Sequence, residues 1–306
     1  MKTYSELEKE CDLAFEKSGP YFHVWTIEDH PIIFQGKKDF IAGMNILAIC
    51  SRLVPEVKII TFQLMTNHIH LTLAGPEEAA RRLFELFKRY LARYLAAGKR
   101  QGVLSSFVLS LRELKDLNDL RNVITYNNRN GYIVHPEHTP FTYPWGANAY
   151  FFNPQAQIRY TESMQYLSKA TRRSFIHSHD ADRVSRIVTL NGYACPMDFC
   201  SIRFGEKIFR CASHYFREIS RNIESQKNIA KEIGERIFYT DDELFGIVLS
   251  ISEEKYGKLK PTLLPPSVKT ELATLLHYDY NASNKQISRM LRLDPRAVDA
   301  LLPHNN

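Results

Sequence analysis

The stretch Asn67-His68-Ile69-His70-Leu71 places two imidazoles two positions apart inside an apolar run that extends from 59 to 73. A strand alternates its side chains between two faces, so His68 and His70 share one face while Ile69 and Leu71 share the other. Two neutral imidazoles on a rigid strand supply two-thirds of a divalent-metal site. A His-x-His pair is common, however, and a pair of partly exposed strand histidines is the simpler interpretation of these residues alone.

A longer match surrounds this pair. Leu64-Met65-Thr66-Asn67-His68-Ile69-His70-Leu71 resembles the signature strand of the single-tyrosine HUH transposases, a family that includes small insertion-sequence transposases and their REP-associated relatives. The pattern of that family is roughly Leu-Met-Pro-Asn-His-hydrophobic-His-Leu, so Thr66 stands where proline is usual. The family also carries a nucleophilic tyrosine on a later helix and a polar metal ligand four residues further on. Ile124–Gly131 resembles that segment, with Tyr126 as the tyrosine and Asn130 as the ligand.

Two further features bear on the match. Tyr143-Pro144-Trp145 resembles the Tyr-Pro-Trp that closes the domain in the REP-associated branch. Gly131 stands where a proline is usual, and the stretch after it is shorter, which leaves the end of the tyrosine helix open. The resemblance covers about residues 20–152.

The spacing of the second segment supports the match on physical grounds. Residues i and i+4 lie one above the other on a helix, so Tyr126 and Asn130 should point the same way. An amide oxygen of Asn130 beside two imidazoles would make a three-ligand site with open positions, suited to Mg²⁺ or Mn²⁺. Those positions would hold a scissile phosphate. Without the match, a core-facing aromatic on an amphipathic helix explains Tyr126 equally well, because the chain contains sixteen tyrosines.

The resemblance implies a metal-dependent enzyme that nicks single-stranded DNA and transfers the strand. Tyr126 would be the nucleophile, His68 and His70 metal ligands and Asn130 the third ligand. The implied intermediate is a 5′-phosphotyrosine with a free 3′-hydroxyl, formed on single-stranded or hairpin DNA. We expect a monomer, with a dimer as the alternative, because the small members of the family are dimers and the longer ones look like monomers.

Composition fits a nucleic-acid enzyme without demanding one. Hydrophobic residues make up 44% of the 306 residues and charged residues 24%, as in ordinary globular proteins. The net charge of +6 is a mild excess that would not by itself suggest DNA. The charged N-terminus lacks the apolar segment of a signal peptide, and no stretch approaches the roughly 18 apolar residues of a membrane span. Five scattered cysteines favour reduced thiols, so we expect a cytoplasmic protein, associated with the nucleoid when it binds DNA.

The order of predicted elements gives the fold class. A short helix over about 4–15 precedes an expected β-α-β-β-α series with strands at 22–26, 59–65 and 68–73 and helices at 39–53 and 77–97. That order is typical of a ferredoxin-like split unit, which a further strand near the tyrosine helix would complete. The expected architecture is therefore an α/β HUH domain over 1–155 and a helical accessory domain over 156–306.

The predicted helix from Glu77 to Ala97 carries the strongest local basic pattern. Its apolar and aromatic residues repeat at spacings of three and four, which indicates a core-facing stripe. The cations opposite that stripe could contact DNA, and a solvated basic face is an equally good interpretation. Arg129, one turn from Tyr126, could contact phosphate or simply favour the end of its helix. The candidate DNA-binding residues of this region are Arg81, Arg82, Lys88, Arg89, Arg93 and Arg129.

The C-terminal part, at about 267–303, predicts a helix-turn-helix. Ser283-Asn284-Lys285-Gln286 has the form of a capping box that opens a helix to about Leu291. Asp294-Pro295 supplies a cap and a first-turn proline for the next helix. The expected DNA contacts are Lys285, Arg289 and Arg292. A small trihelical core that touches no DNA is the alternative.

Two other functions are open. One is a domesticated DNA-binding regulator that keeps the fold and the helix-turn-helix but does not cut. The other is a phosphodiesterase with paired His-x-Ser/Thr motifs, which the strand carrying His68-Ile69-His70 does not provide.

Overall fold

The fold comes from a computed structural model of the chain. It describes residues 2–27, 31–134, 138, 142–156, 162–184, 186–221, 229–230, 239, 241–257 and 260–303. Contacts between residues divide the chain into two compact units, Met1–Ile229 and Ala230–Asn306, and each is described by itself.

The hairpin of β2 (Lys58–Leu64) and β3 (Ile69–Ala74) is the centre of the first unit. The Met65 N–H donates to the His68 carbonyl across a distance of 2.9 Å, which closes the turn at Thr66 and Asn67. The pairing then runs from Leu64 opposite Ile69 back toward Lys58 opposite Ala74. The two strands and their tight connection were predicted from the sequence and are confirmed.

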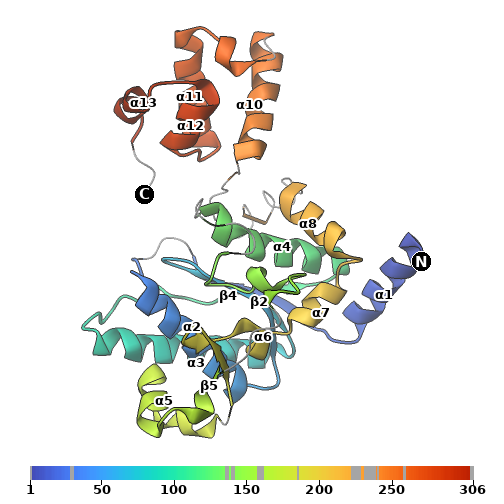
Figure 1. The fold of residues 1–306 in the computed structure, drawn as a ribbon, viewed down its shortest axis with the longest axis vertical. Coiled ribbons are helices and arrows are strands. Elements are labelled where there is room, and N and C mark those ends of the chain that lie inside the picture. The colour runs from blue at the N-terminus through green and yellow to red at the C-terminus, as the bar shows by residue number, and fades with distance from the viewer. Residues whose placement is uncertain are drawn as a thin grey trace. The chain divides into compact units, whose positions relative to one another are not determined.

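The first unit has a mixed α/β fold, with helices packed around one main sheet. Its strand order is β2-β3-β1-β4, and every neighbouring pair is antiparallel. The elements of this part, in chain order, are α1 (Tyr4–Glu16), β1 (Tyr21–Trp25), α2 (Lys37–Leu53), β2, β3, α3 (Glu77–Ala97), β4 (Ser110–Leu114) and α4 (Leu117–Val134). The helices lie on both faces of the sheet, with α4 on one side and α2 and α3 on the other (Figure 1).

The two faces of the sheet differ in chemistry because the strand residues alternate. Val24, Phe62, Ile69, Leu71 and Leu73 point to the α2 side, and none exposes more than 1% of its surface. Burial of such side chains stabilises by about 1.5–3 kcal/mol each relative to exposure. This layer fixes the register of the sheet, because a slip of one residue would turn every apolar side chain to the opposite face.

Further elements complete the first unit after residue 155. They are β5 (Glu162–Ser163), α5 (Lys169–Ile176), β6 (Val188–Leu190), β7 (Tyr193–Ala194), α6 (Pro196–Phe199), α7 (Ile202–Lys207) and α8 (Ala212–Arg221), with short 3-10 turns at Asn148–Tyr150, Met164–Tyr166 and His179–Arg183. β5, β6 and β7 form a three-stranded sheet. α5 contacts α2 and α3, and α8 contacts α4. Residues 162–221 therefore belong to the same compact unit as the main sheet, and the domain boundary expected at 155 stays a prediction.

The second unit is helical where it is described. Its elements are α10 (Asp241–Tyr256), a 3-10 turn at Pro261–Leu263, α11 (Pro266–Asp279), α12 (Asn284–Leu291) and α13 (Pro295–Leu301). Ser283 and Gln286 form the predicted capping box of α12, and the Asp294 side chain accepts from the Arg296 N–H at 2.8 Å. The two helices with these caps were predicted from the sequence and are confirmed. Among the described helices of both units, none combines the length and the apolar character that crossing a bilayer requires.

Candidate active site

The sheet face under α4 is unusually polar for a buried surface. In β1 and β3, Trp25 lies opposite His70 and His23 lies opposite Thr72. Residues directly opposite each other in an antiparallel pair point to the same face. All four side chains therefore project toward α4, and His23, His70 and Thr72 are fully buried.

The two histidines of the His-x-His pair lie at the start of β3. The ring centroids of His68 and His70 are 5.0 Å apart, and the rings are nearly perpendicular, at 89°. His68 exposes 7% of its surface, and its Nδ1 is 2.8 Å from the Asn67 Oδ1, so Asn67 orients the ring. His68, just before β3, and His70, within β3, thus lie close together, as the alternation predicted.

Tyr126 lies on α4 above this pair. Its ring centroid is 5.7 Å from that of His70 and 6.4 Å from that of His23, with edge-on geometry in both cases. The side chain of Tyr126 is 3% exposed. A polymeric substrate would reach its hydroxyl only after covering groups move aside.

Polar contacts fix α4 on the sheet next to Tyr126. The Asn127 Nδ2 donates to the Thr72 Oγ1 at 2.8 Å. Asn128 accepts from the Thr61 hydroxyl and donates to the Tyr215 hydroxyl on α8 at 2.7 Å. Each neutral hydrogen bond contributes about 0.5–1.5 kcal/mol, and each one specifies the position of the helix.

Asn130 follows Tyr126 by one helical turn and is partly buried. Just beyond it, Gly131 packs against β2, where its N–H donates to the amide oxygen of Gln63 at 3.0 Å. Tyr143 closes this end, because its hydroxyl donates to the Leu64 carbonyl at 2.8 Å. α4 therefore continues through Gly131 and is described as far as Val134.

The donor set is compatible with an oxygen- and nitrogen-ligated divalent ion. His68 and His70 offer two imidazole nitrogens, and the amide of Asn130 is an oxygen donor of the kind that Mg²⁺ and Mn²⁺ accept. In the part of the chain that the structure describes, no group of three or more His, Cys, Asp or Glu side chains is arranged to hold a metal. A site here would therefore depend on the amide ligand, and Asn130 as that ligand stays a prediction.

His23 was not singled out from the sequence. Its ring stacks on that of His70, with centroids 5.7 Å apart and an interplanar angle of 18°, and it lies 4.9 Å from that of Trp25. In the sequence His23 has no second histidine beside it. The residues of β1 are all buried, so burial does not alternate along the strand and marks no polar face. Only the pairing of β1 with β3 brings it to the site.

The predicted basic face of α3 is exposed at several positions. Arg81 pairs with Glu77 on its own helix at 2.7 Å, and Arg82 pairs with Glu56 at 2.6 Å. Lys88 is half-buried, and Arg89 and Arg93 are exposed. The guanidinium carbons of Arg89 and Arg93 lie 5.1 and 5.6 Å from the centre of the Tyr90 ring. DNA binding by this face stays a prediction.

Arg129 and the cations of the second unit have different surroundings. Arg129 is 2% exposed, so its guanidinium lies inside the first unit and a phosphate could meet it only in the interior. Lys285, Arg289 and Arg292 are exposed on the second unit. Arg289 pairs with Asp241 at 2.8 Å, which partly offsets its charge.

Comparison of the chain with protein-family models, with curated proteins and with solved structures gives no significant match. The inference of function therefore rests on the residues and on the geometry of this site.

Proposed function

We propose that the chain is a metal-dependent enzyme that nicks single-stranded DNA and transfers the strand through a covalent tyrosine intermediate. The observation that carries this proposal is the position of Tyr126, whose ring centroid lies 5.7 Å from that of His70 on the polar face of the sheet. A helix tyrosine and a His-x-His strand, 56 residues apart in the sequence, thus meet inside one site.

The arrangement of elements supports the same proposal. From β1 to β4 the order is β-α-β-β-α-β, and the strands lie in the order β2-β3-β1-β4. This order supports a ferredoxin-like split unit, the fold that the resemblance to HUH transposases implies. The resemblance also gives the substrate, single-stranded or hairpin DNA, and the polarity of the covalent link.

In the proposed reaction, the phenolic oxygen of Tyr126 attacks the phosphorus of one phosphodiester. A bond forms between that oxygen and phosphorus, and the bond from phosphorus to the 3′ oxygen breaks. The 3′ oxygen leaves as a hydroxyl after taking up a proton, and the phenolic proton leaves to solvent. A later attack by a 3′-hydroxyl on the phosphotyrosine restores a phosphodiester and frees Tyr126, which is strand transfer.

The residues around Tyr126 orient it for this attack. His68, His70 and Asn130 would hold the divalent ion, which when bound neutralises charge on the phosphate. The hydrogen bonds of Asn127 and Asn128 hold α4 on the sheet, so the phenol is kept above the imidazoles. A precisely held nucleophile removes part of the entropic barrier to reaction.

Covalent capture tests the proposal. Labelled hairpin-bearing single strands are mixed with the protein and Mn²⁺ and resolved on a denaturing gel. We expect label to remain on the protein, to be lost with EDTA and to be lost in Tyr126→Phe. Tyr132→Phe is the matched control, because it makes the same change six residues further along α4. This variant should keep the adduct. An adduct that persists in Tyr126→Phe and disappears in Tyr132→Phe would move the nucleophile to Tyr132.

A second function, DNA binding without cutting, is favoured by one observation. Tyr126 is 3% exposed, while the capped helices α12 and α13 present exposed cations. A regulator would bind DNA tightly, form no adduct with any strand, and bind unchanged when Tyr126, His68 and His70 are substituted. Adduct formation excludes this alternative.

A further inference from the structure

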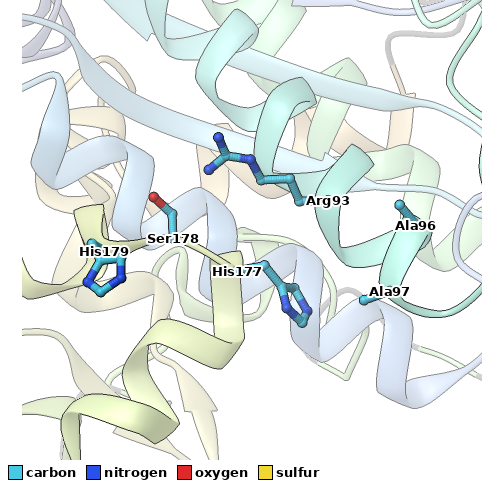
Figure 2. Close-up of a pocket in the computed structure, with 6 residues that line it drawn as sticks. All are labelled: Arg93, Ala96, Ala97, His177, Ser178 and His179. Atoms are coloured by element: carbon cyan, nitrogen blue, oxygen red, sulfur yellow. The ribbon is translucent and has the colours of Figure 1, made fainter.

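A shallow hollow separates the C-terminal end of α3 from the segment that follows α5. Figure 2 shows Arg93, Ala96 and Ala97 on one wall and His177, Ser178 and His179 on the other. The hollow has a volume of about 620 Å³. A second hollow of about 350 Å³ continues over α5, shares the same three residues of the second wall and adds Arg173.

The residues beside this hollow carry an excess of positive charge. Arg89 and Arg93 flank the ring of Tyr90, and Arg173 and Arg183 approach from the α5 side. The nearby carboxylates are Asp180 and Asp182. Among the described residues that line the two hollows, Arg93 and Arg173 are cations and none is a carboxylate.

The carboxylates are already engaged by other groups. Asp180 accepts from the Tyr90 hydroxyl at 2.7 Å and from the Ser178 hydroxyl at 2.9 Å. Asp182 is held by the guanidinium of Arg173. Among the described residues, no carboxylate lies within ion-pair distance of Arg93, whose guanidinium is held over the Tyr90 ring instead. Arg93 is therefore both positioned and available for an anion from outside.

The shape and the donors favour a polymer backbone over an enclosed small molecule. On the α3 side the side chains of Ala96 and Ala97 are short, so that wall does not enclose the hollow. His177 and His179 are exposed on the opposite wall. Each imidazole N–H and the guanidinium of Arg93 can donate to phosphate oxygens. A chain of phosphodiesters could pass along both hollows and meet donors from each wall.

We propose that this hollow binds the phosphodiester backbone of the single-stranded DNA on which the chain acts, through Arg93, His177 and His179. The inference rests on the proposed function, and it gives a role to residues 169–183, in which the sequence showed no chemistry. The segment would hold the strand on α3 while another part of the same strand reaches Tyr126.

The test measures binding of a labelled single strand by fluorescence anisotropy at several salt concentrations, with the full chain carrying Tyr126→Phe so that no cleavage intervenes. The central pair is Ala97→Glu and Ala97→Gln, two nearly isosteric changes at an exposed helix position that differ in one charge. Arg93→Gln removes the central cation. Lys9→Gln, an exposed cation on α1, controls for net charge.

We expect Ala97→Glu to weaken binding about 10-fold and Ala97→Gln to change it less than 2-fold. Arg93→Gln should weaken binding by a similar factor and lower the slope of log K against log salt by about 0.7, the value for one phosphate of a single strand. Equal affinities for the two Ala97 variants, or an Arg93→Gln variant that behaves like Lys9→Gln, would overturn the inference while leaving the proposed function standing. A chain that binds only RNA of the same sequence, or no single strand at all, would overturn both.

Adduct formation with Mn²⁺ tests the nicking proposal independently of the strand-binding inference. If Tyr126 forms no adduct but the Ala97 pair differs as expected, the hollow is a strand-binding site and the nicking proposal fails. If adducts form and the Ala97 pair binds alike, the nicking proposal holds and the strand runs elsewhere.

Discussion

At Gly131, α4 and the sheet approach so closely that a methyl group has little room. An added Cβ would lie 1.5 Å from a terminal atom of the Gln63 amide and 2.4 Å from the ring of Tyr143. Gln63 can rotate, but Tyr143 is 1% exposed and hydrogen-bonded to the Leu64 carbonyl. A proline here would in addition lose the N–H that donates to Gln63. Glycine at this position therefore follows from the packing of this chain.

We predict that Gly131→Ala destabilises the first unit by about 1–3 kcal/mol, the usual effect of overpacking a core. The measurement is urea unfolding followed by tryptophan fluorescence, since both tryptophans, Trp25 and Trp145, belong to the first unit. Gly246→Ala is the control, because Gly246 lies inside α10 with nothing within 4 Å of an added Cβ. That change lies in the second unit and should leave the tryptophan-reported transition of the first unit unchanged, and an equal effect of both changes would contradict the packing argument.

At the scale of elements, α8 holds the tyrosine helix through one buried hydroxyl. The Tyr215 hydroxyl accepts from Asn128 on α4 and donates to the Asn148 Oδ1 at 2.6 Å. Tyr215 is 0% exposed, so water cannot replace these bonds. α8 lies outside the segment that resembles a transposase domain, yet it supports the helix that carries Tyr126.

Tyr215→Phe should cost about 1–3 kcal/mol of stability, because it leaves buried amide groups of Asn128 and Asn148 without a partner at that position. Tyr278→Phe removes a hydroxyl from a side chain that is 65% exposed and should change stability by less than about 0.5 kcal/mol. Thermal unfolding of the two variants beside the parent protein gives both values. Similar melting temperatures for Tyr215→Phe and the parent would show that the hydroxyl does not hold α4.

A second element-scale contact makes stability depend on pH. Glu8 on α1 receives hydrogen bonds from Arg121 on α4 at 2.7 Å and from Arg210 at 2.8 Å. The Arg121 guanidinium, followed by that of Arg210, lowers the pKa of Glu8 from 4.5 to about 2. A carboxyl whose pKa is lowered by folding stabilises the protein above its unfolded pKa, and this stabilisation is lost as the pH falls from about 4.5 toward 2.

We expect Glu8→Gln to cost about 1–3 kcal/mol near pH 7, because it leaves the buried Arg121 without its carboxylate partner. The difference between Glu8→Gln and the parent should shrink as the pH is lowered from 5 to 3. Urea midpoints at pH 7, 5, 4 and 3 give this difference directly. A difference that stays constant over that range would mean that the carboxylate charge contributes nothing to holding α1.

The elements of the site that could be predicted are those with local signals. Alternation in 59–73 predicted the hairpin and the shared face of the two histidines, and the resemblance to the transposase segment predicted the helix of Tyr126. His23 could not be predicted as part of the site, because β1 is buried on both faces and its residues show no alternation. The hydrogen-bond partners of Asn127 and Asn128 could not be predicted either. They come from β3, β2 and α8, and contacts between distant segments leave no pattern along the chain. The same reason hid the packing of 162–221 onto the main sheet.

At the scale of the whole molecule, the division after Ile229 separates two kinds of core. The first unit is built around a sheet, and the second closes a small helical core with Leu272, Leu276, Ile287 and Leu291, each at most 1% exposed. The caps of α12 and α13 are made by residues of the second unit itself. The second unit therefore has its own buried core and its own helix caps.

If chemistry resides in the first unit and the second unit binds duplex DNA, a chain ending at residue 229 should still form the covalent adduct with single strands and should lose most of its affinity for duplex DNA. Full adduct yield is expected because His68, His70, Tyr126 and Asn130 all belong to Met1–Ile229. The duplex contacts of Lys285, Arg289 and Arg292 would be removed together, and each lost phosphate contact lowers the salt slope by about 0.9 for duplex DNA.

Circular dichroism first checks that the shorter chain is folded. Denaturing gels then measure the adduct yield of both chains, and fluorescence anisotropy measures their affinity for duplex DNA. Loss of the adduct in a folded 1–229 chain would mean that nicking requires the second unit, whereas unchanged duplex affinity would mean that its helices form only a trihelical core.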